Sequence, residues 1–258
     1  MVVKVDRNHE NQVIELCGQV GKILLVNGAE IPRVEETVEY IGHSAGVAIS
    51  CYVTLTAIFI SVDTEPMTHV VKTNPGSFNL QKVDEINELS REFVAQEIGF
   101  DELSRHVAQV DRKVIDFNWP SKIIGAGLVS VAPMLLFRTA WSDLAMAFWI
   151  GIVGYLAAMY VKKIAAIPFI GEVVGGFSVA LLALLVVHFG WANNSNNIII
   201  SALMPLVPGV PITNAFREII AGHLISGVMR TINALLVAGF IGSGVILAGL
   251  LFRAVFGV

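Results

Sequence analysis

Residues 204–218 interrupt a long uncharged run with the sequence Met204-Pro205-Leu206-Val207-Pro208-Gly209-Val210-Pro211-Ile212-Thr213-Asn214-Ala215-Phe216-Arg217-Glu218. Each proline removes a backbone donor and clashes with the preceding helical turn, so this stretch cannot continue a regular helix. In hydrocarbon, such a break is tolerated only where protein or a water-filled cavity surrounds it. The stretch therefore predicts a discontinuous membrane helix.

The predicted break is also a candidate binding site. Thr213 or Asn214 can cap a helix that restarts after Pro211, which leaves a partly positive helix N-terminus beside free backbone carbonyls. Discontinuous helices in transporters bind anionic groups and ions in this way. The guanidinium groups of Arg217 and Arg230 add paired donors for a carboxylate. The predicted substrate-binding residues are Pro208, Gly209, Thr213, Asn214, Arg217 and Arg230.

A simpler interpretation of the same stretch stays open. The prolines can merely kink the helix near its inner end, while Arg217 and Arg230 extend their charged ends to lipid headgroups. A charge within a span normally faces the bundle interior or water, so Glu172 and Glu218 are candidates for proton or ion coupling. For Glu172, pairing with an arginine or a plain interfacial position is equally open. We expect His188 at a membrane interface and Asp143 as a helix cap in an outer loop.

The composition around this stretch is that of a membrane protein. Of the 258 residues, 55% are hydrophobic and 15% are charged, against about 25% charged in a typical soluble domain. Trp119-Pro120 marks a boundary, since an aromatic residue at an interface precedes a proline that can start a helix. Beyond it lie uncharged runs at 123–137, 144–161, 173–187, 197–216 and 231–252. These runs predict an α-helical bundle of about five transmembrane helices over residues 119–258, since a span needs about 20 residues.

Residues 1–118 are predicted to form a small cytoplasmic α+β domain. The apolar spacing of residues 12–26 and 32–43 predicts a helical hairpin. Residues 48–62 are rich in β-branched and aromatic side chains and predict one strand, which returns at 67–73 after a turn at 63–66. Helices are expected again at 80–97 and 100–114.

Basic residues set the expected orientation. No signal peptide is evident at the start of the chain, so the N-terminus is expected to be cytoplasmic in a multi-pass protein of the cytoplasmic (inner) membrane. With that orientation, more basic residues lie on the inner side than on the outer side, as the positive-inside rule requires. The inner set is Arg112, Lys113, Lys122, Lys162, Lys163, Arg217 and Arg230, and the outer set is Arg138 and Arg253.

Several classes of function lack support. The net charge of −4 and the absence of a basic cluster argue against nucleic-acid binding. The sequence holds no nucleophile elbow, phosphate loop or metal-ligand cluster, so we expect no enzyme, cofactor or metal. Cys17 and Cys51 are interpreted as free thiols. Arg33 lies between carboxylates in residues 27–36, which favours a solvated salt-bridge cluster over a binding site.

Two stretches resemble the threonine/serine exporter family, specifically its separate N-terminal-half subunits of the succinate-exporter type. They are residues 27–35 and residues 205–218, the latter followed by Gly222, Ser226-Gly227 and Arg230. The resemblance implies export of threonine and serine or of succinate, and a small partner subunit with about five further spans. A homo-oligomer stays open beside that partner. The competing hypothesis is a membrane-anchored sensory or interaction module.

Overall fold

The computed structural model describes residues 7–62, 68–74, 76, 78–113, 118–136, 139–165 and 167–257. The chain divides into two compact units. The first unit comprises Met1–Asp116 and Thr213–Arg230, and the second comprises Phe117–Ile212 and Thr231–Val258. The turn predicted at 63–66 and the outer residue Arg138 lie outside the described residues, and the domain boundary expected at residue 119 stays a prediction.

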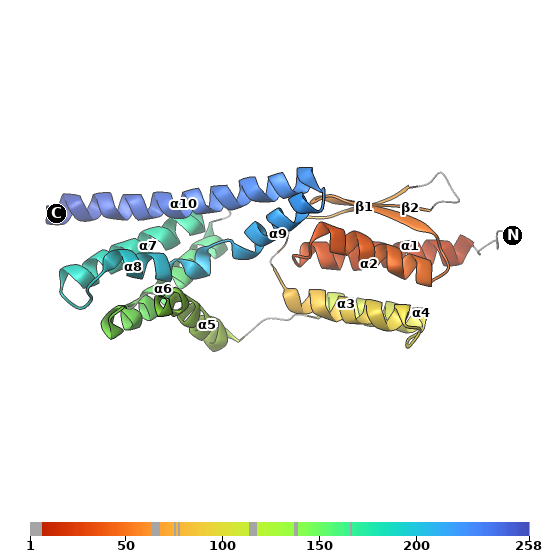
Figure 1. The fold of residues 1–258 in the computed structure, drawn as a ribbon, viewed down its shortest axis with the longest axis horizontal. Coiled ribbons are helices and arrows are strands. Elements are labelled where there is room, and N and C mark those ends of the chain that lie inside the picture. Colours follow the sequence, from red (N-terminus) through yellow and green to blue (C-terminus); the bar gives the residue numbers. More distant parts are fainter. Residues whose placement is uncertain are drawn as a thin grey trace. The chain divides into compact units, whose positions relative to one another are not determined.

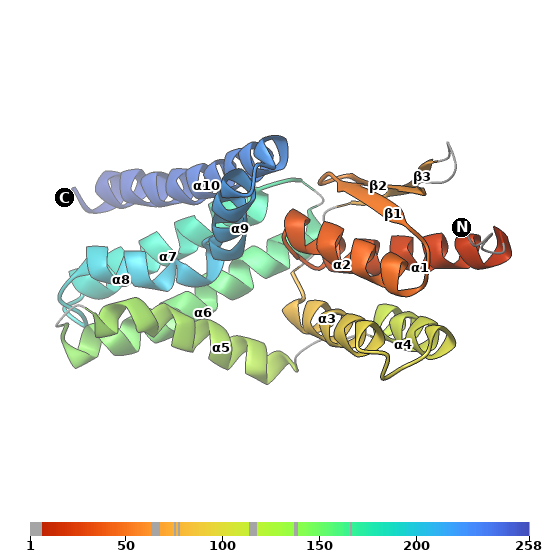
Figure 2. The same ribbon diagram turned by 45° about the vertical axis from the view of Figure 1, so that its right-hand side comes forward.

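The first unit has three layers, with α1 and α2 between a β-sheet and the pair α3 and α4 (Figures 1 and 2). Its core is built from the apolar faces of α1 and α2, for example Val13, Leu24 and Ile41, against Ile58 and Ile60 of the sheet. The helices are α1 (Arg7–Val26), α2 (Ile31–Ser44), α3 (Leu80–Val94) and α4 (Phe100–Arg112), and the strands are β1 (Ile49–Val53), β2 (Ala57–Val62) and β3 (Thr68–Lys72). The helical hairpin and the later helix pair predicted from the sequence are confirmed.

The sheet is antiparallel in the order β1-β2-β3, whereas the sequence predicted a single strand over residues 48–62. That prediction is wrong because the chain turns back between β1 and β2. The hydroxyl of Thr54 donates to the carbonyl of Ala57 at 3.0 Å and accepts from the Ala57 amide at 3.0 Å, which closes the turn. This turn contains no Gly, Pro, Asn or Asp, so the usual turn signals are missing.

The second unit is helical. It contains α5 (Trp119–Val131), the 3₁₀ turn η1 (Ala132–Leu135), α6 (Trp141–Ile164), α7 (Ile170–His188), α8 (Ser195–Ala202), the 3₁₀ turn η2 (Met204–Leu206), and most of α10 (Leu224–Phe256). The helix α9 (Gly209–Ile220) begins in this unit and ends in the first. Small residues allow α7 and α10 to approach closely, because Gly176 faces the backbone of Ile241 and Gly244 faces the backbone of Val173.

Three of the described helices, α6, α7 and α10, are long and apolar enough to cross a membrane. A fourth candidate is the pair formed by residues 195–206 and α9, which is bent by 69° at the break. The discontinuous helix predicted at the proline-rich stretch is therefore confirmed. The first predicted run, residues 123–137, forms the end of α5 and the turn η1. At 13 residues, α5 is shorter than a usual span. The count of about five spans stays a prediction.

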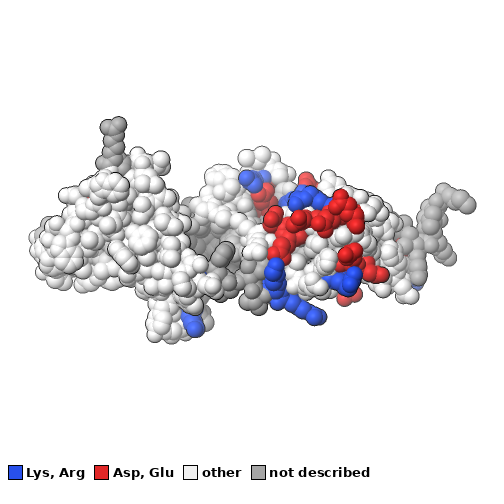
Figure 3. Space-filling model, turned by 90° about the horizontal axis from the view of Figure 1, so that it is seen from below, with Lys and Arg blue, Asp and Glu red and all other residues white. Residues whose placement is uncertain are grey.

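Charge is distributed unevenly over the surface. On the face drawn in Figure 3, acidic and basic side chains gather where α3 lies, and the part that belongs to the second unit is almost free of them. Large apolar side chains of α10, such as Leu235, Ile246 and Leu250, are exposed instead. Exposed apolar helices of this kind are typical of a protein surrounded by lipid.

Asp143 departs from its prediction, whereas the membrane-interface position expected for His188 stays a prediction. Asp143 lies in the first turn of α6 and is buried, and its carboxylate accepts from the backbone amide of Asn193 at 2.7 Å. It therefore tethers a distant loop and does not cap its own helix. His188 is the last residue of α7, and its ring lies 4.6 Å from that of Phe256.

Candidate functional site

The loop between α1 and α2 is shaped by Gly28. Its φ of +97° lies in the left-handed region, which favours glycine. The Gly28 amide donates to the carbonyl of Leu25 at 3.3 Å and the Ala29 amide to that of Leu24 at 3.0 Å, the double hydrogen bond that ends many helices. Pro32 then lies in the first turn of α2, where a proline is well tolerated. The loop residues 28–31 are thereby held in a tight, defined path.

The end of α9 is built in the same way around Gly222. This glycine has a φ of +91°, its amide donates to the carbonyl of Ile219 at 3.1 Å, and the His223 amide donates to that of Glu218 at 2.9 Å. The same pair of hydrogen bonds closes the helix. As a result, His223 is fixed at the turn that leads into α10.

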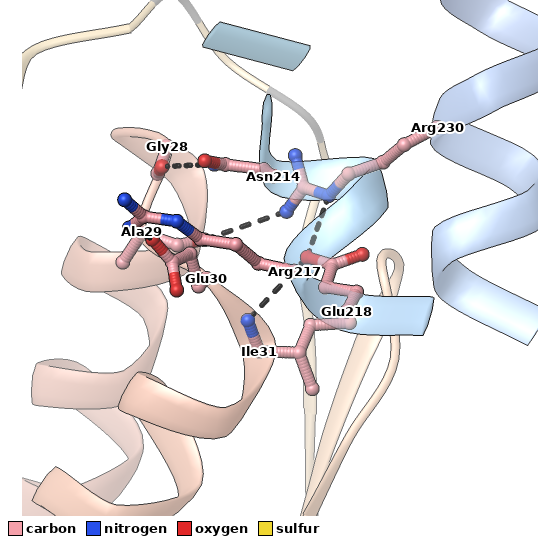
Figure 4. A network of polar contacts seen from close by, with 8 residues as sticks. All are labelled: Gly28, Ala29, Glu30, Ile31, Asn214, Arg217, Glu218 and Arg230. Atoms are coloured by element: carbon pink, nitrogen blue, oxygen red, sulfur yellow. Dashed lines mark hydrogen bonds and ion pairs between the residues drawn. The ribbon is translucent and has the colours of Figure 1, made fainter. Parts of the chain in front are cut away.

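These two segments, far apart in the sequence, meet inside the first unit. Figure 4 shows the loop after α1 facing α9, with Arg230 reaching in from the start of α10. The buried amide of Asn214 donates to the carbonyl of Gly28 at 3.0 Å. The guanidinium of Arg217 forms an ion pair with the carboxylate of Glu30. The two stretches that carried the family resemblance are therefore parts of one structure.

Glu218 is the most deeply placed charge in this group. Its side chain is 0% exposed, and its Oε1 atom accepts from Arg230 Nε at 2.7 Å and from the Ile31 amide at 3.4 Å. The Ile31 amide is one of the donors that the first turn of α2 leaves without a helical partner, so the carboxylate caps α2 from outside. The Oε2 atom is buried and has no hydrogen-bond partner among the described residues. That free oxygen is where a proton or cation could bind.

The exposure of Arg217 sets it apart from Arg230. The Arg217 side chain is 63% exposed, whereas that of Arg230 is 11% exposed. An exposed ion pair contributes little to stability, while a buried charge depends strongly on its partner. Arg217 can therefore exchange its carboxylate partner at low cost, and Arg230 cannot.

The remaining predicted residues lie elsewhere along the break. Gly209 is the first residue of α9, so the helix begins before Pro211 and not after it. Pro211 fits because the first turn of a helix does not need its amide donor. Thr213 and Asn214 consequently lie beyond the cap position, and the prediction that either caps the helix is wrong. Pro208 lies just before α9, and Gly209 has open space around its Cα atom.

Glu172, the other predicted coupling residue, belongs to the second unit. It lies in the first turn of α7, is 8% exposed, and pairs with Lys162 Nζ at 2.6 Å. Its partner is a lysine of α6 and not an arginine. Its Oε2 atom is buried and, like that of Glu218, has no hydrogen-bond partner in the described part of the chain.

Sequence reasoning missed two residues of this group, Glu35 and His223, and misjudged the role of Glu30. The expected cluster around Arg33 reduces to an exposed contact with Glu36 at 3.9 Å and a hydrogen bond to Asn87 at 3.0 Å. Glu35 instead accepts from the Val53 amide at 2.8 Å and lies 3.3 Å from His223 Nε2. The run of carboxylates at 30–36 was the available signal, but it does not show which distant residue each one meets.

The apolar helices, the broken helix and the group of charged residues on α9 together define a class of protein. It is a multi-pass membrane protein with a charged site on a discontinuous helix. Residues 15–252 match the family described as "Putative threonine/serine exporter". The chain therefore belongs to the threonine/serine exporter family. Membership identifies it as a membrane exporter and not an enzyme, in agreement with the expectation from the sequence. No solved structure matches the chain at a significant level.

Two curated relatives cover nearly the whole chain, and a third covers about three quarters of it. The "Probable succinate transporter subunit YjjP" of Klebsiella aerogenes is 22% identical over 254 residues, which is 95% of this chain and 96% of that protein. The protein of the same name from Escherichia coli K12 is 22% identical over 249 residues, covering 93% and 94%. The "Pheromone-regulated membrane protein 10" of Pichia sorbitophila is 26% identical over 196 residues, 73% of this chain and 19% of that protein. Two of these relatives are thus named as subunits, which implies a partner protein.

Proposed function

We propose that this chain is one subunit of a secondary transporter that exports a small carboxylate-bearing metabolite, succinate or threonine and serine, across the cytoplasmic membrane. Its partner is a small second membrane subunit with about five further spans. The relatives named as succinate transporter subunits and the family description support this range of substrates. All of these substrates carry at least one carboxylate, which is the chemical feature that the site must recognise.

One observation carries the proposal: Arg217, on the helix that follows the break, already holds a carboxylate, that of Glu30. Arginine binds a carboxylate through paired hydrogen bonds, and Arg217 is exposed enough to change partners. In the proposed mechanism, the substrate carboxylate displaces Glu30 from Arg217. Asn214 and Arg230 keep the loop and α9 in place while Pro208, Gly209 and Thr213 line the adjoining break.

The coupling ion in this proposal is a proton, bound at Glu218 or Glu172. Each of these carboxylates pairs with a basic residue through one oxygen and has a second, buried oxygen without a hydrogen-bond partner among the described residues. Replacement of each by glutamine keeps the size of the side chain and removes the proton site. If either carboxylate carries the coupling proton, its variant loses export driven by a pH gradient and keeps exchange of labelled for unlabelled substrate.

The direct test is efflux from vesicles that contain this chain with and without its partner subunit, loaded in parallel with labelled succinate, threonine and serine. We expect Glu30→Gln to lower the KM of the transported substrate, because it removes the competing carboxylate. Glu36→Gln is the matched control, since Glu36 makes an exposed contact on the same helix. Arg217→Ala is expected to abolish efflux and Arg33→Ala to leave it unchanged. Normal efflux by the Arg217→Ala variant would rule out the proposed role.

The proposed topology has the N-terminus inside, about five spans including α5, and the C-terminus outside. An odd number of spans places the two termini on opposite faces, and an even number places them on the same face. An alkaline phosphatase fused after α10 is active only outside the cytoplasm. Activity in that fusion supports five spans, and inactivity with an intact fusion supports four.

A further inference from the structure

The turn at the end of α9 carries a second pair of titratable side chains next to the proposed substrate site. His223 Nε2 lies 3.3 Å from Glu35 Oε2, and the two side chains are 20% and 17% exposed. The other oxygen of Glu35 accepts from the Val53 amide at 2.8 Å, at the end of β1. Glu35 is thus fixed to the sheet, and His223 is fixed to α9 because its backbone amide donates a hydrogen bond to the carbonyl of Glu218. The pair connects the sheet to the turn.

The charges around the pair are mostly acidic. Glu39, on the next turn of α2, faces Glu35, and its carboxylate accepts from the Cys51 amide at 2.9 Å. Cys51 of β1 also faces Glu35, and Glu218 of α9 faces His223, with Arg230 of α10 neutralising Glu218. Burial raises the pKa of Glu35, while the Val53 hydrogen bond and His223 lower it. A positive charge on His223 therefore stabilises the negative charges of these partly buried carboxylates.

We propose that His223 and Glu35 form a proton-operated latch, which holds the turn after α9 and with it Arg217 in the position that pairs with Glu30. The mechanical connection is short, since the Ala221 amide donates to the carbonyl of Arg217 at 2.9 Å in the last turn of α9. Histidine is the side chain that ordinarily changes charge between pH 5 and 8. Protonation of His223 strengthens the latch, because it adds the attraction between opposite charges to the contact with the Glu35 carboxylate. The effect on transport rests on the proposed function of Arg217.

The test measures the latch directly in the full chain. Ala221 is exposed beside Gly222, so a nitroxide spin label on Ala221→Cys reports the mobility of the turn. The native Cys17 and Cys51 are buried, so they compete little for the label. As the pH rises from about 5.5 to about 7.5, we expect the ratio of mobile to held label to increase roughly fivefold, since loss of the proton removes the positive charge of His223 and with it the ion pair to Glu35.

Matched variants separate the latch from other titrations. His223→Gln and Glu35→Gln each remove one member of the pair and are expected to lose the pH transition. His43→Gln, an exposed histidine on the same helix as Glu35, is expected to keep it. A transition that persists in both pair variants, or its absence from the parent protein, would overturn the latch. Failure of the proposed substrate site would appear only in efflux by the Arg217 variants and leaves this spectroscopic result unaffected.

Discussion

Arg230 donates through Nε to Glu218 Oε1 at 2.7 Å; the Glu218 side chain is fully buried, and that of Arg230 is only 11% exposed. Removal of one partner from a buried ion pair leaves an uncompensated charge and costs about 3–5 kcal/mol. Removal of an exposed partner costs about 0–1 kcal/mol. We therefore expect Arg230→Ala to lower the thermal unfolding temperature of the detergent-solubilised protein markedly, and Arg217→Ala to change it little.

This difference decides how transport by the two variants is interpreted. Loss of efflux in Arg217→Ala with an unchanged unfolding temperature indicates a direct role with substrate. Loss of efflux in Arg230→Ala indicates instead that the structure of the site is disturbed. Equal unfolding temperatures for the two variants would contradict the burial argument, and Arg33→Ala supplies the baseline for an exposed arginine.

Helix α10 offers a matched pair of glycines. A methyl group on Gly244 would meet the backbone of Val173 and Phe177, whereas the space around Gly242 is open. Backbone atoms cannot move aside as a flexible side chain can, so we expect Gly244→Ala to destabilise the protein. Gly242→Ala is expected to be neutral or to stabilise the helix by up to about 1 kcal/mol. Unfolding temperatures in one detergent compare the two, and equal behaviour would show that α7 and α10 do not approach as described.

The cysteines are predicted to be unreactive in the folded protein. Burial is the main cause that raises the pKa of the Cys17 and Cys51 thiols to about 12. Alkylation requires the thiolate, which at pH 8 is then roughly one part in ten thousand. We expect maleimide labelling to be slow in the native protein and rapid after denaturation, as mass spectrometry can follow. Rapid labelling of both native thiols would contradict their placement in the core.

The same shifts predict a stability that falls at high pH. The pKa of each thiol is raised in the folded state, so the unfolded chain releases these protons first, from about pH 9. Below that pH both states keep the proton and the thiols contribute no pH dependence. Between about pH 9 and pH 12 the free energy of unfolding should decrease, by up to about 1.4 kcal/mol per pH unit for each thiol. A Cys17→Ser/Cys51→Ser variant should lose this slope.

Deletion of residues 1–110 is expected to abolish export. It removes the carbonyl of Gly28, the amide of Ile31 and the carboxylate of Glu30, which Asn214, Glu218 and Arg217 contact. Efflux from vesicles that contain the partner subunit measures the outcome. Retained efflux would show that these contacts are dispensable. It would also exclude a sensory role of residues 1–110 that is essential for transport.

Local signals in the sequence predicted a large part of the structure. Three prolines close together require a broken helix wherever the chain is placed, and Trp119-Pro120 does begin α5. The third predicted run, residues 173–187, forms a helix that extends beyond Glu172 on one side and to His188 on the other. These features depend on neighbours in the chain, which is why spacing and composition suffice.

The pairing of side chains could not be predicted in the same way. Nothing near Glu30 shows that its partner is Arg217, because the contact depends on the paths of α1 and α9 after Gly28 and Gly222. The start of α9 was placed too late in the sequence. The first turn of a helix accepts proline, so Pro211 lies inside α9 and does not mark the end of the break. The Thr54 turn was missed because its hydroxyl supplies hydrogen bonds that other turns obtain from asparagine or aspartate, and the turn contains no glycine or proline.

The grouping of Thr213–Arg230 with Met1–Asp116 has a consequence for biosynthesis. A ribosome makes the first segment early, but the residues that cap α2 and pair with Glu30 leave it only after residues 117–212 have been made. Until then, the Ile31 amide and the Glu30 carboxylate must be satisfied by water. The charged site can therefore assemble only after Thr213–Arg230 have been synthesised. A product truncated before this segment cannot present a completed Arg217 site.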